Sequence, residues 1–307
     1  MIYEEELIFK VNRKTLATVL FIAIVFFGTI SFLLQGENKR ELFITISVHI
    51  LATLIVAFFI ATILIYKKPT ENNEQIKILG PGNIIDHEFD ISKLNTDFWY
   101  FSGGTGTEAR KVTLPSLGLK SKNENNPLQI KILLIDPSDL ELCKKYCFCR
   151  LRHTMTEELT ERKVQLKIYA TLLACLYWEK NSPLDIEVYF KNVFSTMQYD
   201  ISENRLIISK SDPREPAFLI TKPNIFYQCV FKEFLLIASQ AHRLDIMLPD
   251  YSFKDLLSDD CGFSKEILTQ QFSLMGIEEL FTDKEFDFII QNAKPDFRKC
   301  RSVTTSA

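Results

Sequence analysis

The chain has 307 residues and a formal net charge of −3, so no overall basic field predicts binding to a nucleic acid polymer. Hydrophobic residues make up 47% of it, and much of that excess lies near the N-terminus. The seven cysteines have irregular spacing and form no evident disulfide framework, which favours a reducing compartment such as the cytoplasm.

Two long apolar runs dominate the first quarter of the sequence. Residues 16–34 carry no charge, and residues 42–66 carry none apart from the titratable His49. Roughly 20 apolar helical residues cross the hydrocarbon core of a bilayer, and the joining segment 35–41 is long enough only for a tight turn. The pattern predicts a transmembrane helical hairpin over residues 15–66. The alternative is a buried helical hairpin of a soluble protein.

Slightly more basic residues lie on each outer side of this hairpin than in its turn. Lys10, Arg13 and Lys14 end the polar leader 1–14, and further lysines follow residue 66. Because cytoplasmic flanks are enriched in Lys and Arg, we expect a multi-pass protein of the bacterial inner (cell) membrane with both termini and the large domain in the cytoplasm. The lipid bilayer is then an expected partner.

A polar stripe interrupts the second apolar run. Thr45, His49 and Thr53 recur at helical spacing and share one face. Such a stripe can form hydrogen bonds between helices of a homo-oligomer, or line a water-filled path. Alternatively, the threonines bond to their own backbone and His49 lies near the headgroups.

After the hairpin, the chain alternates between short strands and helices. Residues 67–85 read as a polar linker, 86–249 as a cytoplasmic α/β domain, 250–293 as a helical C-terminal segment and 294–307 as a tail. The pattern predicts strands over 98–102, 129–135, 184–190, 193–201, 205–209 and 217–221, and helices over 140–153, 157–180 and 226–244.

The strongest candidate site is the glycine-rich turn after the first of these strands. A strand, a glycine loop and a helix start form an arrangement that offers free N–H groups to an anion. The spacing matches neither a P-loop nor a dinucleotide fingerprint, and the alternative is a plain tight turn. The candidate ligand-binding residues are Ser102, Gly103, Gly104, Thr105, Gly106, Thr107 and Arg110.

Other motifs predict no catalytic or metal chemistry. Cys143, Cys147, Cys149 and His153 are interleaved with lysine and arginine on one predicted helix, and we interpret the thiols as small buried side chains instead of metal ligands. None of the four histidines lies in a known catalytic motif. We therefore expect no enzyme activity, no metal and no cofactor.

The order of these elements resembles a phospholipase-D-like domain. The resemblance rests on WYFSGGTG, IKILLIDPSD, IEVYF, VFSTMQYDISENRLIIS and AFLIT, and it covers about residues 98–244. It implies a mixed sheet with helices on both sides. Active members use H-x-K-x4-D, which this chain lacks, so the resemblance implies a degenerate copy and carries over no catalytic residue.

A two-helix hairpin ahead of a sensor domain is also similar to membrane effectors of anti-phage defence that respond to cyclic nucleotides. This analogy implies that an anionic nucleotide, such as a cyclic nucleotide, gathers the domains into a homo-oligomer whose hairpins then perturb the inner membrane. Two alternatives stay open: a membrane-anchored phosphodiesterase or lipid-acting enzyme with an unrecognised site, and an anchored scaffold for a partner protein.

Overall fold

We describe a computed structural model of the chain over residues 76–94, 96–151, 159–210, 212, 214–246 and 264–300. All of these residues belong to one compact unit, Asn73–Ala307. The predicted hairpin 15–66 and its stripe of Thr45, His49 and Thr53 lie outside the described residues.

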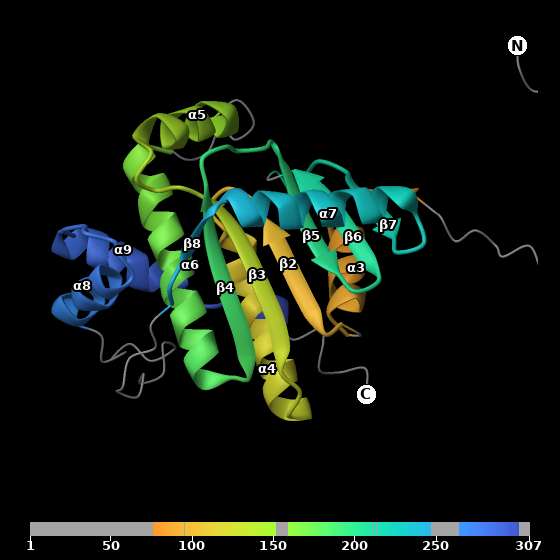
Figure 1. Cartoon of the computed structure of the whole chain (residues 1–307), viewed down its shortest axis with the longest axis horizontal. Coiled ribbons are helices and arrows are strands. Elements are labelled where there is room, and N and C mark those ends of the chain that lie inside the picture. Colours follow the sequence, from red (N-terminus) through yellow and green to blue (C-terminus); the bar gives the residue numbers. More distant parts are fainter. Residues whose placement is uncertain are drawn as a thin grey trace, which may run out of the picture. The chain divides into compact units, whose positions relative to one another are not determined.

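The described residues form a mixed α/β fold (Figure 1). Its strands are β1 (Ile76–Leu79), β2 (Phe98–Ser102), β3 (Leu128–Ile135), β4 (Leu184–Lys191), β5 (Met197–Ser202), β6 (Arg205–Lys210), β7 (Ala217–Thr221) and β8 (His242–Leu244). Its helices are α3 (Asn83–Leu94), the π-helix η1 (Ala109–Thr113), α4 (Leu114–Glu124), α5 (Leu140–Leu151), α6 (Glu161–Asn181), α7 (Ile225–Gln240), α8 (Lys265–Leu274), α9 (Asp283–Ala293) and α10 (Phe297–Cys300).

The strands join in a single sheet in the order β1-β7-β6-β5-β2-β3-β4-β8. Strands β2, β3 and β4 are parallel, and all the other pairs are antiparallel. The carboxyl ends of the three parallel strands therefore meet at one edge of the sheet, which is where ligand sites of α/β folds gather. The glycine-rich turn begins at this edge, directly after Ser102.

Helices cover both faces of the sheet. Successive side chains of a strand point to opposite faces, so each face carries apolar side chains that a helix can bury. Trp99 and Phe101 face α4 and α6 and belong to the main core. Tyr100, between them, faces the opposite side and belongs to the core beneath α7. The near-continuous apolar sequence of β3 fits a strand that is buried on both faces.

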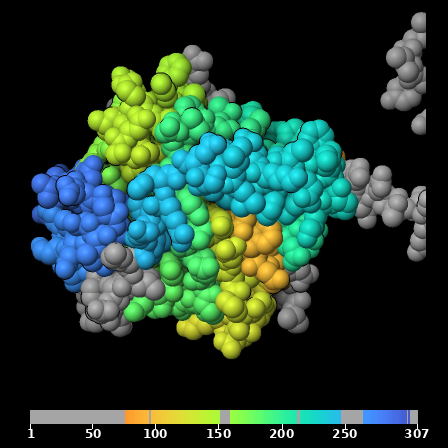
Figure 2. Space-filling model, in the orientation of Figure 1, coloured from red at the N-terminus to blue at the C-terminus, as the bar shows by residue number. Residues whose placement is uncertain are grey.

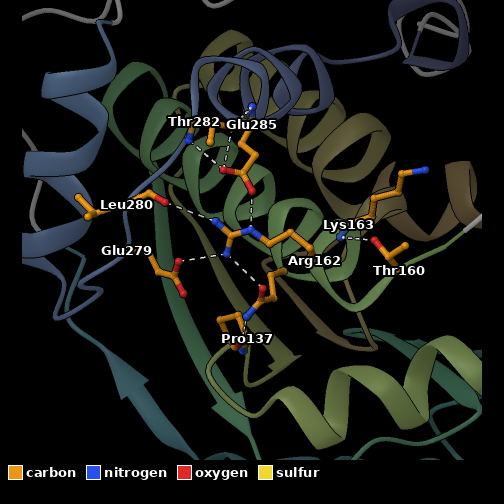
Figure 3. A network of polar contacts seen from close by, with 9 residues as sticks. Pro137, Thr160, Arg162, Lys163, Glu279, Leu280, Thr282 and Glu285 are labelled. Carbon is orange, nitrogen blue, oxygen red and sulfur yellow. Dashed lines mark hydrogen bonds and ion pairs between the residues drawn. The ribbon is translucent and has the colours of Figure 1, made fainter.

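The C-terminal helices pack on α6 through an aromatic cluster and one arginine. Tyr169 of α6 contacts the rings of Phe272 and Phe281. Arg162 donates from Nε to Glu285 at 2.6 Å and from Nη1 to Glu279 at 3.0 Å (Figure 3). This guanidinium lowers the pKa of Glu285 to about 2. The C-terminal segment is therefore an integral part of the α/β unit.

No helix within the described ranges 76–300 is long and apolar enough to cross a membrane. The predicted fold class included a transmembrane hairpin, and the predicted location was the inner membrane. The structure supports neither, and we correct the fold class to a mixed α/β fold with an eight-stranded sheet.

The sheet also begins earlier in the chain than predicted. Strand β1 lies inside the range 67–85 that we interpreted as a linker, and it pairs with β7 at the sheet edge. The interpretation failed because β1 has only four residues and is followed by the turn at Gly82. Likewise, the end of the predicted helix 226–244 is strand β8, which pairs with β4.

Candidate functional site

The glycine-rich turn continues the pairing of β2 with β3. The Gly103 N–H donates to the Leu133 carbonyl at 3.1 Å, and the Ile135 N–H donates to the Gly104 carbonyl at 3.2 Å. A Cβ atom on Gly104 would overlap the ring of Tyr146 from α5. Gly106 has a φ of 66°, in the left-handed region that favours glycine. Close packing therefore explains these glycines.

Replacing Gly104 with alanine is expected to lower the free energy of unfolding by about 1–3 kcal/mol, because overpacking forces Tyr146 or the turn to shift. Gly80→Ala is the matched control, since its Cβ would meet its nearest atom, in Ile84, at an ordinary 3.6 Å. Urea denaturation of both variants measures the difference. Equal stability of the two variants would show that Tyr146 moves away without cost.

Arg110 is fully buried, with 0% of its surface exposed. Its Nη1 donates to the Thr171 hydroxyl at 3.0 Å and to the Thr105 carbonyl at 3.3 Å. Its Nε donates to the Asn292 carbonyl at 2.8 Å. Burial lowers the pKa of the guanidinium to about 9. Arg110 thus joins the turn to α6 and α9, and these contacts favour a structural role.

The remaining candidate residues are also largely enclosed. Ser102 and Thr105 are buried, and Thr105 shares a hydrogen bond of 3.0 Å with the half-buried Thr107. The structure therefore brings together all the residues of the predicted loop, but in the interior. Direct contact between this loop and a ligand stays a prediction.

A buried lysine lies beside the loop. Lys191 ends β4, and its Nζ donates to the Ser102 hydroxyl at 2.8 Å. Burial alone lowers the pKa of this amine to about 8.

A buried acid lies on the opposite face of the sheet. The Trp99 Nε1 donates to Asp200 Oδ1 at 3.1 Å, whereas Asp200 Oδ2 has no hydrogen-bond partner in the described part of the chain. Burial, with a smaller contribution from the charge of Glu108, raises the pKa of Asp200 to about 7, although hydrogen bonds from Trp99 and Gln198 lower it. Sequence reasoning missed this group, because its burial is a product of tertiary packing and not of a local motif.

A concave site lies between α3, η1 and α10. This α3–η1 cavity has a volume of about 310 Å³. Its lining residues are Asn83, Asp86, His87, Phe89, Asp90, Lys93, Glu108, Val112, Thr113 and Arg298. The glycine loop contributes indirectly, since it positions η1 and Glu108 at the cavity wall.

Acidic groups outnumber basic ones in the α3–η1 cavity. Lys93 Nζ is 3.2 Å from Asp90 Oδ1, and Arg298 Nε is 3.4 Å from the neighbouring Asp296. Among the described residues, neither Asp86 nor Glu108 lies within ion-pair distance of these two cations. The cavity therefore presents two carboxylates whose charge its own cations do not pair.

The wall at η1 is a π-helix, a rare element that often marks functional sites. Its widened turn frees carbonyls that the C-terminal segment bonds. The Asp296 N–H donates to the Lys111 carbonyl at 2.9 Å, and the Cys300 thiol lies 3.8 Å from the Val112 carbonyl. The cavity wall is therefore bonded directly to the region of α10.

Two of the three thiols on α5 are buried, and that of Cys149 is half-buried. Cys143 and Cys147 lie in the main core, and burial raises the pKa of Cys143 to about 12. Among the described residues, no group of three or more metal-ligating side chains is placed to hold an ion. His153 lies outside the described residues.

Comparison with known proteins gives no family. No family model matches the chain, and no curated protein matches it. Among solved structures, it is similar to TrmBL2, an archaeal chromatin protein described as showing a novel mode of DNA binding. The identity is 12%, the match covers 66% of this chain and 67% of that chain, and the TM-score is 0.32. A likeness this weak carries no argument about function.

These comparisons correct the family suggested by the sequence pattern. No family model matches the chain, so none supports a phospholipase-D-like domain or a membrane effector. The predicted family is therefore wrong, and we assign the chain to none.

Proposed function

We propose that the α/β unit is a ligand-sensing module and that the α3–η1 cavity is its binding site. The observation that carries this proposal is the convergence of polar side chains from α3, η1 and α10 on one cavity of about 310 Å³. This volume lies at the lower end of the range for small-molecule sites. It suits a ligand the size of one or two rings.

The charges of the cavity select the ligand class. Asp86 and Glu108 favour a positively charged group and disfavour a phosphate, since like charges at close range cost binding energy. Phe89 offers an apolar surface for a flat ring. We therefore propose a small organic cation with an aromatic or apolar part, in place of the anionic nucleotide expected from the sequence.

A matched pair of probes tests this choice. Tryptamine and indole-3-propionate have the same ring and a side chain of similar length, but opposite charges. Titration calorimetry of the full chain is expected to give binding of tryptamine at about millimolar or tighter, and much weaker binding of the acid. Cyclic AMP, as the anionic nucleotide, is expected not to compete.

Substitutions then locate the site. Glu108→Gln removes one carboxylate charge and is expected to weaken tryptamine binding roughly tenfold, because a charged hydrogen bond contributes about 1.5 kcal/mol or more. Glu141→Gln, at an exposed position of α5, makes the same chemical change away from the cavity and should leave binding unchanged. Absence of tryptamine binding, a preference for the acid, or equal weakening by both variants would overturn the proposal.

A further inference from the structure

Helix α7 exposes an unusual number of apolar side chains. Its inner face packs on the sheet through Tyr227 and Phe234. On its outer face, Ile225 is 67% exposed, Phe226 is 56% exposed and Leu236 is 51% exposed. Figure 2 shows this helix lying across the front of the described unit. These apolar side chains lie toward the two ends of the helix, with the exposed Lys232 and Glu233 between them. Exposed apolar groups that gather on one face mark interaction sites more often than isolated side chains do.

The exposed residues follow the spacing of a helix-pairing seam. Ile225, Cys229, Lys232, Leu236 and Ser239 are all exposed and recur alternately four and three residues apart. This spacing places the five side chains in one line along the helix, with Ile225, Cys229 and Leu236 as its less polar members. In paired helices, a polar residue such as Lys232 at one position of such a line sets the register.

The charges in the middle of the seam identify the partner. Lys232 and Glu233 are adjacent, exposed, and joined by no ion pair to another described residue. If a second α7 lies antiparallel, with the two-fold axis between these positions, each Lys232 faces the Glu233 of the other copy. A parallel arrangement would place like charges together. The seam is thus self-complementary, as an isologous interface requires.

We propose that α7 forms an antiparallel two-fold interface with α7 of a second copy of this chain, centred on Lys232 and Glu233. The apolar surface continues toward the sheet edge, where Ile78 is 72% exposed and pairs in register with the half-exposed Phe218. Helix α7 is about 24 Å long. The surface area that each of two such helices buries is therefore smaller than the roughly 800 Å² per partner of a standard interface. The dimer is therefore reversible and depends on concentration. This inference does not depend on the proposed ligand.

Charge reversal gives a decisive test. Sedimentation velocity of the full chain, kept in solution with a mild detergent because of its two apolar runs, measures the dimerisation constant. Glu233→Lys and Lys232→Glu are each expected to weaken dimerisation roughly tenfold, since each replaces two attractive contacts by repulsive ones. The double variant with both changes restores attraction and should recover wild-type affinity. All positions are exposed, so circular dichroism should show an unchanged fold.

Cross-linking tests the geometry separately. In a Cys229→Ser background, Lys232→Cys places a thiol next to the proposed axis and should form a disulfide dimer on mild oxidation. Lys222→Cys, exposed but before the start of α7, is the control and should stay monomeric. A chain that is monomeric throughout, a double variant that fails to recover, or equal cross-linking at both positions would overturn the proposal.

Discussion

Replacing Arg110 with alanine is expected to destabilise the folded chain by about 3–5 kcal/mol, the cost of removing one member of a buried polar network. The guanidinium joins the glycine turn to α6 and α9 through carbonyls of Thr105, Lys167 and Asn292. Alanine would deprive the Asn292 carbonyl of this donor, while the Thr105 and Lys167 carbonyls would keep the Thr171 hydroxyl. It would also open a cavity in place of a large, fully buried side chain. Urea denaturation measures the loss.

Arg214→Ala is the matched control for this prediction, because it deletes the same side chain from an exposed position. Arg214 is 74% exposed and pairs with Asp212, so its loss is expected to change stability by no more than about 0.5 kcal/mol. Arg110→Lys should retain only part of the stability. It keeps the charge and most of the side chain, but an ammonium group cannot reach several fixed carbonyls at once as the planar guanidinium does. A loss below about 1 kcal/mol for Arg110→Ala would mean that water satisfies the carbonyls.

The burial of Arg110 could not be predicted from the sequence. The local pattern of strand, glycines and helix start located the turn correctly, and β2 lies at the predicted residues. The pattern could not show that the turn is enclosed, because Tyr146 and Thr171 come from helices far along the chain. From the sequence alone, a cation near a helix start is interpreted as a ligand contact. In the fold, however, internal carbonyls accept the hydrogen bonds of Arg110.

The same limit applies to the α3–η1 cavity. Its walls come from segments that are distant in sequence, so that His87, Glu108 and Arg298 share no local motif. Strands with strong alternation or continuous apolar runs, such as β3 and β7, could be predicted because their signal is local. The edge strands β1 and β8 have only four and three residues, too few for a local signal, and pairing with β7 and β4 makes them strands.

The second large effect is expected from Asp200, where a substitution should stabilise the chain. Asp200 is 3% exposed, and burial raises its pKa to about 7 from an ordinary value of 3.8. The folded state therefore binds this proton more tightly than the unfolded state does. The contribution of Asp200 to stability is fully present below about pH 4 and is lost as the pH rises through 7.

Asp200→Asn removes this ionisation while keeping the shape and an oxygen that can accept from the Trp99 Nε1. At pH 8 we expect the variant to be more stable than the wild type by on the order of 2–4 kcal/mol, and at pH 5 the difference should be much smaller. Trp99 fluorescence during urea unfolding at both pH values measures this difference. Asp287→Asn, at an exposed position of α9, should show no such dependence. A difference in stability between variant and wild type that is the same at both pH values would overturn this prediction, because it would mean that Asp200 is already ionised in the folded state at pH 5.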